Sequence, residues 1–352
     1  MNILWFGKTG EANAWYHISL TAEPELVNNV KVIRYKNPAR IPESNNVEII
    51  ESGDTGSFFK DAFKLMKCAY SELRKGNEDV IITFNVFPYG FMAYILSLIH
   101  KKKLILCFIG ADFNSHFQSQ PYKSLILKAL HFADIIICKG HHMTQGLIEA
   151  GVDNEKLAYY PHFVSDKWFV EPGNNQKKYD IINVCELIER KRVDVLLYAL
   201  KILKDRGISL KTCIVGDGPE LEKLKSLAND LQLNSNVDFV GFKKDVLKYL
   251  KQSRIFVQTS KGEGLSLSLM ESLAAGLVPV CTVAGSEKDI ITHDSNGLFI
   301  EIGDPDDLAE KLMYLQDSKV YERIQQQVLK DRQQFTLSHA GKKMNKILKK
   351  IG

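Results

Sequence analysis

Two glutamates, Glu263 and Glu271, stand eight positions apart in the stretch 260–276 and bracket a glycine-bearing turn. The apolar run 255–257 before the turn reads as a strand, and the residues after it read as a helix. The apolar positions that share one face of that helix are Met270, Leu273, Ala274 and Leu277. Backbone N–H groups 264–267 at the start of such a helix would be free donors at the positive end of its dipole. The stretch therefore predicts an anion site suited to a phosphate-bearing ligand.

The spacing of the two carboxylates limits what they can do together. If the residues between Glu263 and Glu271 are all helical, the separation is roughly 12 Å. That distance is too long for one shared proton, but it suits a pair of groups that hold two ends of one elongated ligand. Glu271 is expected on a polar stripe with Ser268, Ser272 and Ala275. The alternative is a solvated helix that carries two exposed carboxylates.

Two further segments carry residues suited to a phosphate ligand. Val215 to Glu220 reads Val-Gly-Asp-Gly-Pro-Glu, between a strand and a helix, where Gly216 and Gly218 let a ligand approach the backbone. It is not a dinucleotide fingerprint, because Leu221 stands where the third glycine belongs. No Gly-x-x-x-x-Gly-Lys-Ser/Thr occurs either. The main sequence evidence for a nicotinamide enzyme or a P-loop NTPase is therefore missing. Lys191, at a helix start in the charged run 186–194, could neutralise a phosphate or could belong to a solvated charge run.

The elements that must position these residues alternate along the chain. Continuous apolar strands joined by helices predict parallel sheets covered on both faces, in two Rossmann-like doubly wound α/β domains that face a central cleft. We expect an N-terminal domain over 1–170 and a second over 171–335, with the polar segment 171–178 as linker. A basic amphipathic helix over about 336–352 is expected to pack back on the first domain, with a membrane surface as the alternative.

Composition excludes several classes of protein. The 352 residues carry a formal charge of +4, 45% hydrophobic and 25% charged residues, which is typical of a globular protein and gives no support to nucleic-acid binding. The six cysteines are scattered singly without zinc spacing, which favours free thiols in the cytoplasm. Neither a signal peptide nor a membrane-spanning helix is expected. Lys101–Lys103 and the basic tail permit peripheral contact with the inner face of a membrane.

These motifs, in their order and spacing, resemble the donor domain of glycosyltransferase family 4, the retaining family of the two-Rossmann (GT-B) fold. The similarity runs across about residues 181–312. Glu263 and Glu271 match the family's Glu-x7-Glu motif. Further matches are Gly216–Pro219, the Val-x-Phe-x-Gly pattern at 237–241, Gly285-Ser286, Asn296-Gly297-Leu298 and Gly303-Asp304.

The resemblance implies transfer of a hexose or N-acetylhexosamine from a UDP- or GDP-sugar to a glycan, lipid-linked or small-molecule acceptor. By the family's pattern, Glu271 would hold the ribose, Phe242 would lie by the base, and Lys191 would hold the diphosphate. Glu263 and the amides after it would hold the sugar. The residues assigned to the donor are Gly7, Gly10, Gly216, Gly218, Phe242, Gly264, Leu265, Ser266 and Glu271, and those assigned to catalysis are Glu263, Lys191 and Asp112. Stabilising the leaving diphosphate with fixed donors and cations needs no protein-bound metal and no cofactor.

The sequence departs from the family at two positions. Cys185-Glu186 stands where Gly-Arg is usual, and Ile109 replaces a histidine that many members place before a glycine, although Asp112 does match the aspartate that often follows. His116 lies nearby, and its role is either structural or catalytic. These departures keep open an alternative function, a non-catalytic nucleotide-sugar-binding protein that retains the fold. A sugar-nucleotide epimerase of the same architecture fits the Glu-x7-Glu motif poorly.

Overall fold

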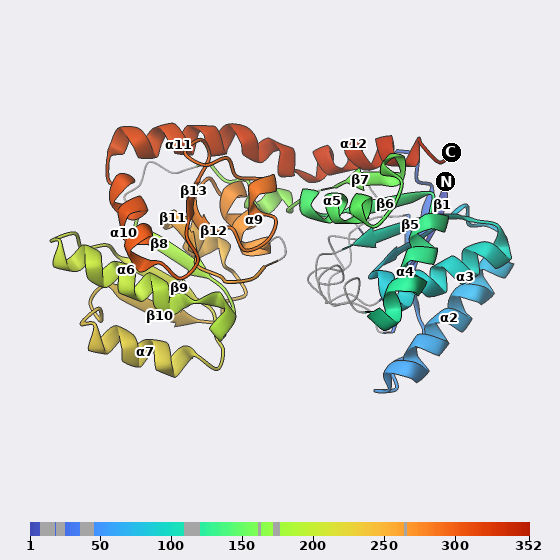
Figure 1. Ribbon diagram of the computed structural model, residues 1–352, viewed down its shortest axis with the longest axis horizontal. Helices are drawn as coiled ribbons and strands as arrows, with labels where there is room; N and C mark the ends of the chain where they lie inside the picture. Colours follow the sequence, from blue (N-terminus) through green and yellow to red (C-terminus); the bar gives the residue numbers. More distant parts are fainter. Residues whose placement is uncertain are drawn as a thin grey trace. The chain divides into compact units, whose positions relative to one another are not determined.

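The chain forms two compact units, and Figure 1 shows their elements. The first unit comprises residues 1–163 and 337–352, and the second comprises 164–336. The computed structural model describes residues 1–7, 18, 25–35, 46–108, 120–160, 163–171, 177–263 and 266–352.

The first unit is built on a seven-stranded sheet in which every pairing is parallel, in the order β3-β2-β1-β4-β5-β6-β7. Its strands are β1 (Asn2–Phe6), β2 (Asn29–Arg34), β3 (Val47–Glu51), β4 (Val80–Phe84), β5 (Lys103–Phe108), β6 (Ile135–Cys138) and β7 (Leu157–Tyr159). The central strands β4 and β6 are buried along their whole length. This burial explains their runs of isoleucine and valine, because such strands have helices on both faces.

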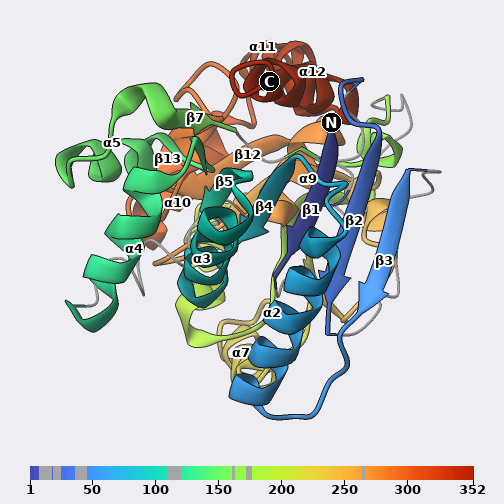
Figure 2. The same cartoon turned by 90° about the vertical axis from the view of Figure 1, so that its right-hand side faces the viewer.

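Helices cover both faces of this sheet (Figure 2). One face packs against α2 (Phe58–Arg74), α3 (Phe91–His100), α4 (Gln120–Phe132) and α5 (His141–Glu149). The other face packs against the C-terminal helix α12 (Leu337–Leu348), from which Met344, Ile347 and Leu348 enter the core. The hydroxyl of Tyr160 donates to the carbonyl of Ala340 at 2.8 Å. The apolar stripe of the C-terminal helix is thus buried in the first unit.

The first segment of the first unit ends at Phe163, whereas the sequence predicted a boundary at residue 170. Val164 and Trp168 pack with Phe256 and Phe335 in the core of the second unit, so the chain has already entered it there. The expected linker, 171–178, therefore follows the boundary, and its residues 172–176 lie outside the described part of the chain.

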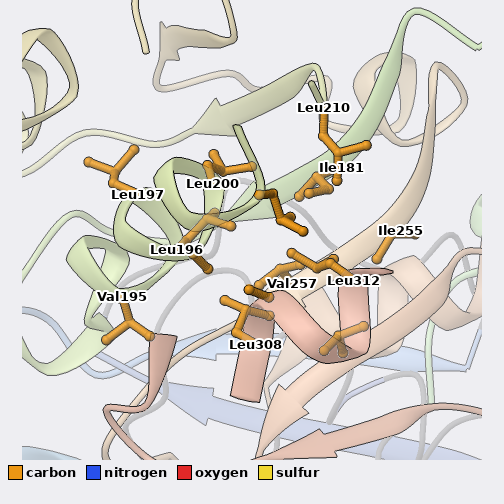
Figure 3. Close-up of a cluster of buried hydrophobic side chains, with 14 of the residues drawn as sticks. Ile181, Val195, Leu196, Leu197, Leu200, Leu210, Ile255, Val257, Leu308 and Leu312 are labelled. Atoms are coloured by element: carbon orange, nitrogen blue, oxygen red, sulfur yellow. The ribbon is translucent and has the colours of Figure 1, made fainter. Parts of the chain in front are cut away.

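The second unit repeats the architecture with six parallel strands in the order β10-β9-β8-β11-β12-β13. Its strands are β8 (Tyr179–Val184), β9 (Thr212–Val215), β10 (Val237–Gly241), β11 (Ser253–Gln258), β12 (Val278–Thr282) and β13 (Leu298–Ile300). Its helices are α6 (Val193–Asp205), α7 (Leu221–Asp230), α8 (Leu247–Leu250), α9 (Leu267–Ala274), α10 (Pro305–Tyr314) and α11 (Ser318–Asp331). Figure 3 shows Leu196, Leu200 and Leu308 packed over Ile181 and Val257 in the core beneath α6 and α10.

Both sheets place the first strand of the unit in the middle, which is the strand order of a doubly wound Rossmann-like fold. The two predicted Rossmann-like doubly wound α/β domains are therefore confirmed. No helix within the described ranges is both long enough and apolar enough to cross a bilayer.

Candidate functional site

The loops at the carboxyl edge of the second sheet carry most of the predicted residues. Because all its strands are parallel, the loops after β8, β9, β11 and β12 leave the sheet at the same edge. Hydrogen bonds join these loops to one another. The N–H of Leu187 donates to the carbonyl of Asp217 at 2.8 Å, and the hydroxyl of Thr282 donates to the carbonyl of Ser260 at 2.6 Å.

Lys191 and Glu263 form an ion pair at this edge. Lys191 ends a short 3₁₀ turn, Glu189–Lys191, and its Nζ donates to Oε1 of Glu263. The same oxygen accepts from the hydroxyl of Ser260 at 2.7 Å, and Arg190 Nη1 lies 3.4 Å from Oε2. The Lys191 and Glu263 side chains are only 14% and 9% exposed, so solvent screens this pair weakly. A largely buried carboxylate thus contacts two cations.

Backbone hydrogen bonds fix the Glu189–Lys191 turn relative to the segment that carries Glu263. The N–H of Lys261 donates to the carbonyl of Arg190, and the hydroxyl of Thr259 donates to the carbonyl of Lys191, both at 2.9 Å. The Arg190 guanidinium also donates to the carbonyl of Gly262. The position of the Lys191 ammonium is therefore set by several contacts and not only by its own side chain.

Glu287 is a residue that sequence reasoning missed. Its fully buried carboxylate accepts from the N–H groups of Ala284 at 3.0 Å and Gly285 at 2.6 Å, and from the amide of Gln258 at 3.1 Å. Burial raises the pKa of Glu287, partly opposed by those backbone N–H groups, and the charge of Glu263 raises it further. The carbonyl of Ala284 in turn accepts from the N–H of Glu263 at 3.0 Å. Glu287 thus anchors the segment against which Glu263 is placed.

Gly216 and Gly218 allow two loops to pack backbone on backbone. A Cβ at Gly216 would lie 1.8 Å from the carbonyl oxygen of Cys185, and one at Gly218 would lie 2.4 Å from that of Leu187. Gly216 and Gly218 were expected to let a ligand approach the backbone closely. In the structure, the atoms that approach them closely are backbone atoms of Cys185 and Leu187. Pro219 lies in the turn before α7, which begins at Leu221.

The helix after the turn is shorter than expected. α9 begins at Leu267, and Ser266 caps it by accepting from the N–H of Leu269 at 3.4 Å. The estimate of the Glu263–Glu271 separation assumed a continuous helix, and that assumption is wrong. The polar stripe expected beside Glu271 is also wrong in part, because Ser272 is fully buried and its hydroxyl donates to the carbonyl of Leu269 at 2.7 Å.

The structure also describes Phe242, Gly7 and Glu186 among the residues that the sequence singled out. Phe242 follows β10 with its side chain 69% exposed. Gly7 follows β1 in the first unit, where a Cβ would meet the carbonyl oxygen of Phe84 at 2.9 Å. Glu186 points to solvent, whereas burial raises the pKa of the neighbouring Cys185 thiol to about 12, which makes it a poor nucleophile. The other sequence candidates, Gly10, Ile109, Asp112, His116, Gly264 and Leu265, lie outside the described residues.

Within the described ranges, no cluster of three or more His, Cys, Asp or Glu residues has the arrangement to hold a metal ion. A surface hollow of about 570 Å³ lies between α6 and α7. Glu189 and Lys261 line its rim, but Lys191 and Glu263 do not. The ion pair therefore lies outside that hollow.

Comparison with known proteins adds a family and several relatives. Residues 164–335 match the model of the family described as Glycosyl transferases group 1. The N-acetyl-alpha-D-glucosaminyl L-malate synthase of Bacillus anthracis is 23% identical over 264 residues, which cover 71% of this chain and 69% of that protein. An uncharacterized glycosyltransferase of Methanocaldococcus jannaschii is 28% identical over 244 residues, 62% of this chain and 60% of that protein. Five other curated glycosyltransferases match over only 35–45% of their own length.

Among solved structures, Anabaena Alr3699/HepE in complex with UDP superposes with a TM-score of 0.80 at 19% identity, covering 99% of this chain and 100% of that chain. HepE has also been solved with UDP-glucose. The fold is therefore that of GT-B glycosyltransferases, and the family match and the relatives together support a glycosyltransferase.

Proposed function

We propose that this chain is a retaining glycosyltransferase of family 4 that transfers a hexose or N-acetylhexosamine from a UDP- or GDP-sugar. The acceptor is a glycan, a lipid-linked sugar or a small molecule. The observation that carries the proposal is the ion pair of Lys191 and Glu263, at the carboxyl edge of a sheet that belongs to the matched segment 164–335. The relative solved with UDP and with UDP-glucose supports a nucleotide-sugar donor.

The chemistry follows from the charges at this edge. The bond from the sugar to the diphosphate breaks as negative charge accumulates on the leaving phosphate, so cations placed there lower the barrier. Lys191 supplies one cation, and Arg190, which also contacts Glu263, supplies a second. Both side chains come from one turn, and Arg190 compensates for the absence of the family's arginine beside Cys185. We expect no metal ion to be required.

Glu263 has two tasks in this proposal. In the absence of donor its carboxylate neutralises Lys191 and keeps the ammonium in place. When the nucleotide sugar is bound, the Lys191 ammonium also donates a hydrogen bond to the phosphate, and Glu263 accepts hydrogen bonds from the sugar hydroxyls. The backbone amides of Gly264, Leu265 and Ser266 complete the sugar side, and Glu271 holds the ribose.

We assign Phe242 to contact with the base of the nucleotide. We assign Gly216 and Gly218 to a close approach of the donor to the protein backbone. Gly7, Gly10 and Asp112 of the first unit are assigned to the donor and the acceptor hydroxyl. We also place the protein in the cytoplasm, where its six free cysteines stay reduced. There it makes peripheral contact with the inner face of a membrane.

The test is release of nucleoside diphosphate from a panel of UDP- and GDP-sugars with soluble sugars and lipid-linked sugars as acceptors. Turnover with at least one pair is expected, with retention of anomeric configuration in the product by NMR. Glu263→Gln should lower turnover at least about a hundredfold, because the charge that develops in the transition state loses a carboxylate positioned to stabilise it. Glu222→Gln, at an exposed position of α7, is the matched control.

Other outcomes separate the alternatives. Tight binding of a nucleotide sugar without turnover across the panel would favour a non-catalytic binding protein. Full turnover by Glu263→Gln would overturn the mechanism. Failure to bind any UDP- or GDP-sugar would overturn both functions.

A further inference from the structure

Helix α2 of the first unit exposes aromatic rings to solvent. The side chains of Phe59 and Phe63 are 83% and 69% exposed, and Tyr70, further along the same side, is 40% exposed. Leu65 and Leu73, on the opposite side, are buried against the sheet. A helix that merely covers a sheet normally places charged residues outward. Large exposed rings at i and i+4 indicate a surface that binds something apolar.

The same outward surface is basic. Lys60, Lys64 and Lys67 are exposed among the aromatic rings. Both carboxylates of α2, Asp61 and Glu72, are buried and engaged with other groups. The Asp61 carboxylate accepts from the N–H of Thr55 at 2.8 Å, and Glu72 accepts from Lys31 at 2.9 Å and also from Lys75. The helix therefore presents cations and aromatic rings outward, and its own negative charges are turned inward.

We call this surface the aromatic–basic face and define it by Phe59, Lys60, Phe63, Lys64, Lys67 and Tyr70. It continues onto the end of α3, which lies beside α2 (Figure 2). The rings of Tyr70 and His100 are 5.0 Å apart between centroids. Just before and after His100, Ile99 is 56% exposed and Lys101 is exposed as well. Apolar and basic groups thus extend together over two neighbouring helices.

This combination selects one kind of partner. Rings that enter the boundary between lipid headgroups and acyl chains, with lysines beside them at the level of the phosphates, are characteristic of helices that lie on anionic bilayers. A protein partner or a second copy would normally bury a central apolar patch from which charges are depleted. Here lysines alternate with the rings along the helix, so charge complementarity favours a lipid surface.

We propose that α2 lies on the surface of an anionic lipid bilayer, with Phe59 and Phe63 inserted between headgroups and the lysines of the aromatic–basic face against lipid phosphates. In this proposal α2 makes the peripheral membrane contact stated under the proposed function, and to that extent the proposal rests on that function. Binding to lipid requires neither donor nor turnover, so the two can fail separately. The C-terminal helix is not this surface, because its apolar stripe is buried in the first unit.

Co-sedimentation of the full chain with vesicles tests the proposal. Binding is expected to vesicles of phosphatidylcholine mixed with phosphatidylglycerol, at least about tenfold more tightly than to phosphatidylcholine alone, and to weaken with salt. Phe59→Ser/Phe63→Ser and Lys60→Gln/Lys64→Gln/Lys67→Gln should each weaken binding by about tenfold or more. Because these side chains are exposed, both variants should keep the thermal unfolding temperature of the wild type.

The matched control is Lys342→Gln/Lys346→Gln/Lys349→Gln, which removes the same charge from exposed positions of the C-terminal segment. It should bind like the wild type, and loss of binding here but not in the α2 variants would overturn the proposal. Absence of binding to any vesicle would overturn it too. So would a dimer in analytical ultracentrifugation that dissociates on Phe59→Ser/Phe63→Ser, since a second copy would then cover the face. Turnover of the Phe59→Ser/Phe63→Ser variant with a soluble acceptor should match the wild type, which separates lipid binding from catalysis.

Discussion

Lys191 and Glu263 are bonded side chain to side chain although 72 positions separate them in the chain. One follows the first strand of the second unit and the other follows the fourth, and the strand order brings β8 and β11 side by side. The ion pair is thus a direct consequence of sheet topology.

Lys191→Met should weaken binding of UDP or GDP alone by about ten- to a hundredfold, because it removes one of the two cations that we assign to the diphosphate. Isothermal titration calorimetry measures this effect, and binding by the wild type should weaken with ionic strength more steeply than binding by the variant. Lys248→Met removes an exposed lysine from α8 and serves as the control. Equal affinities for wild type and Lys191→Met would exclude a phosphate role for this lysine.

Glu287→Ala should destabilise the second unit by about 2–4 kcal/mol, because two backbone N–H groups and the Gln258 amide lose their buried acceptor. Turnover should fall as well, since Glu263 is held against Ala284. Denaturant unfolding and steady-state kinetics measure the two effects. Glu287→Gln, which keeps an acceptor oxygen, should recover part of both, and Glu301→Gln at an exposed position should change neither. A fall in stability with unchanged turnover would show that Glu287 does not position Glu263.

Gly216→Ala should destabilise the second unit by about 2–4 kcal/mol, because the new methyl group would overlap the carbonyl of Cys185. Gly207→Ala separates this clash from the cost of backbone conformation. Gly207 has a φ of 81° and nothing within 4 Å of an added Cβ, so only about 1 kcal/mol should be lost there. Urea unfolding of both variants gives the difference, and equal losses would contradict the close packing described here.

Lys139→Met should stabilise the first unit by about 1–3 kcal/mol at pH 7, because it removes a buried charge. Lys139 is 2% exposed, and its Nζ, 4.8 Å from the centroid of the Tyr160 ring, has no hydrogen-bond partner within the described residues. Lys128→Met, at an exposed position of α4, should have little effect.

The stabilisation by Lys139→Met should also depend on pH. Burial lowers the pKa of Lys139 to about 8. The unfolded chain, with an ordinary lysine pKa of about 10.4, therefore binds more protons than the folded chain above pH 8. The contribution of Lys139 to the free energy of unfolding must then rise with pH between these values, and the advantage of the variant must shrink. Urea midpoints of both proteins at pH 7 and pH 9.5 measure the change, and a constant difference would mean that Lys139 stays charged.

The sequence predicted continuous apolar strands, and β4 and β6, whose residues are all buried, have that pattern. It did not reveal β3, an edge strand without a buried residue, or α11, where only three of fourteen residues are buried. In both elements the buried apolar residues are too few for the sequence to be distinguished from that of a polar loop.

At the candidate site, residue types were predictable and partners were not. The charged run 186–194 did not show that Lys191 turns toward Glu263 while Glu186 turns to solvent, because that depends on the backbone of the 3₁₀ turn. Glu287 sits in the polar sequence Ser-Glu-Lys-Asp, which is typical of a solvated turn. Only the tertiary structure shows that its carboxylate points inward to satisfy backbone N–H groups.

The place of α12 in the first unit has a consequence for synthesis on the ribosome. The strands of the first sheet are synthesised before the second unit, yet the helix that covers one face of that sheet is synthesised after it. The second unit, 164–336, is continuous in sequence and lies wholly within the chain before that helix. The unit whose synthesis begins first is therefore completed only after the second unit has been made, and one apolar face of its sheet is covered only when α12 has been synthesised.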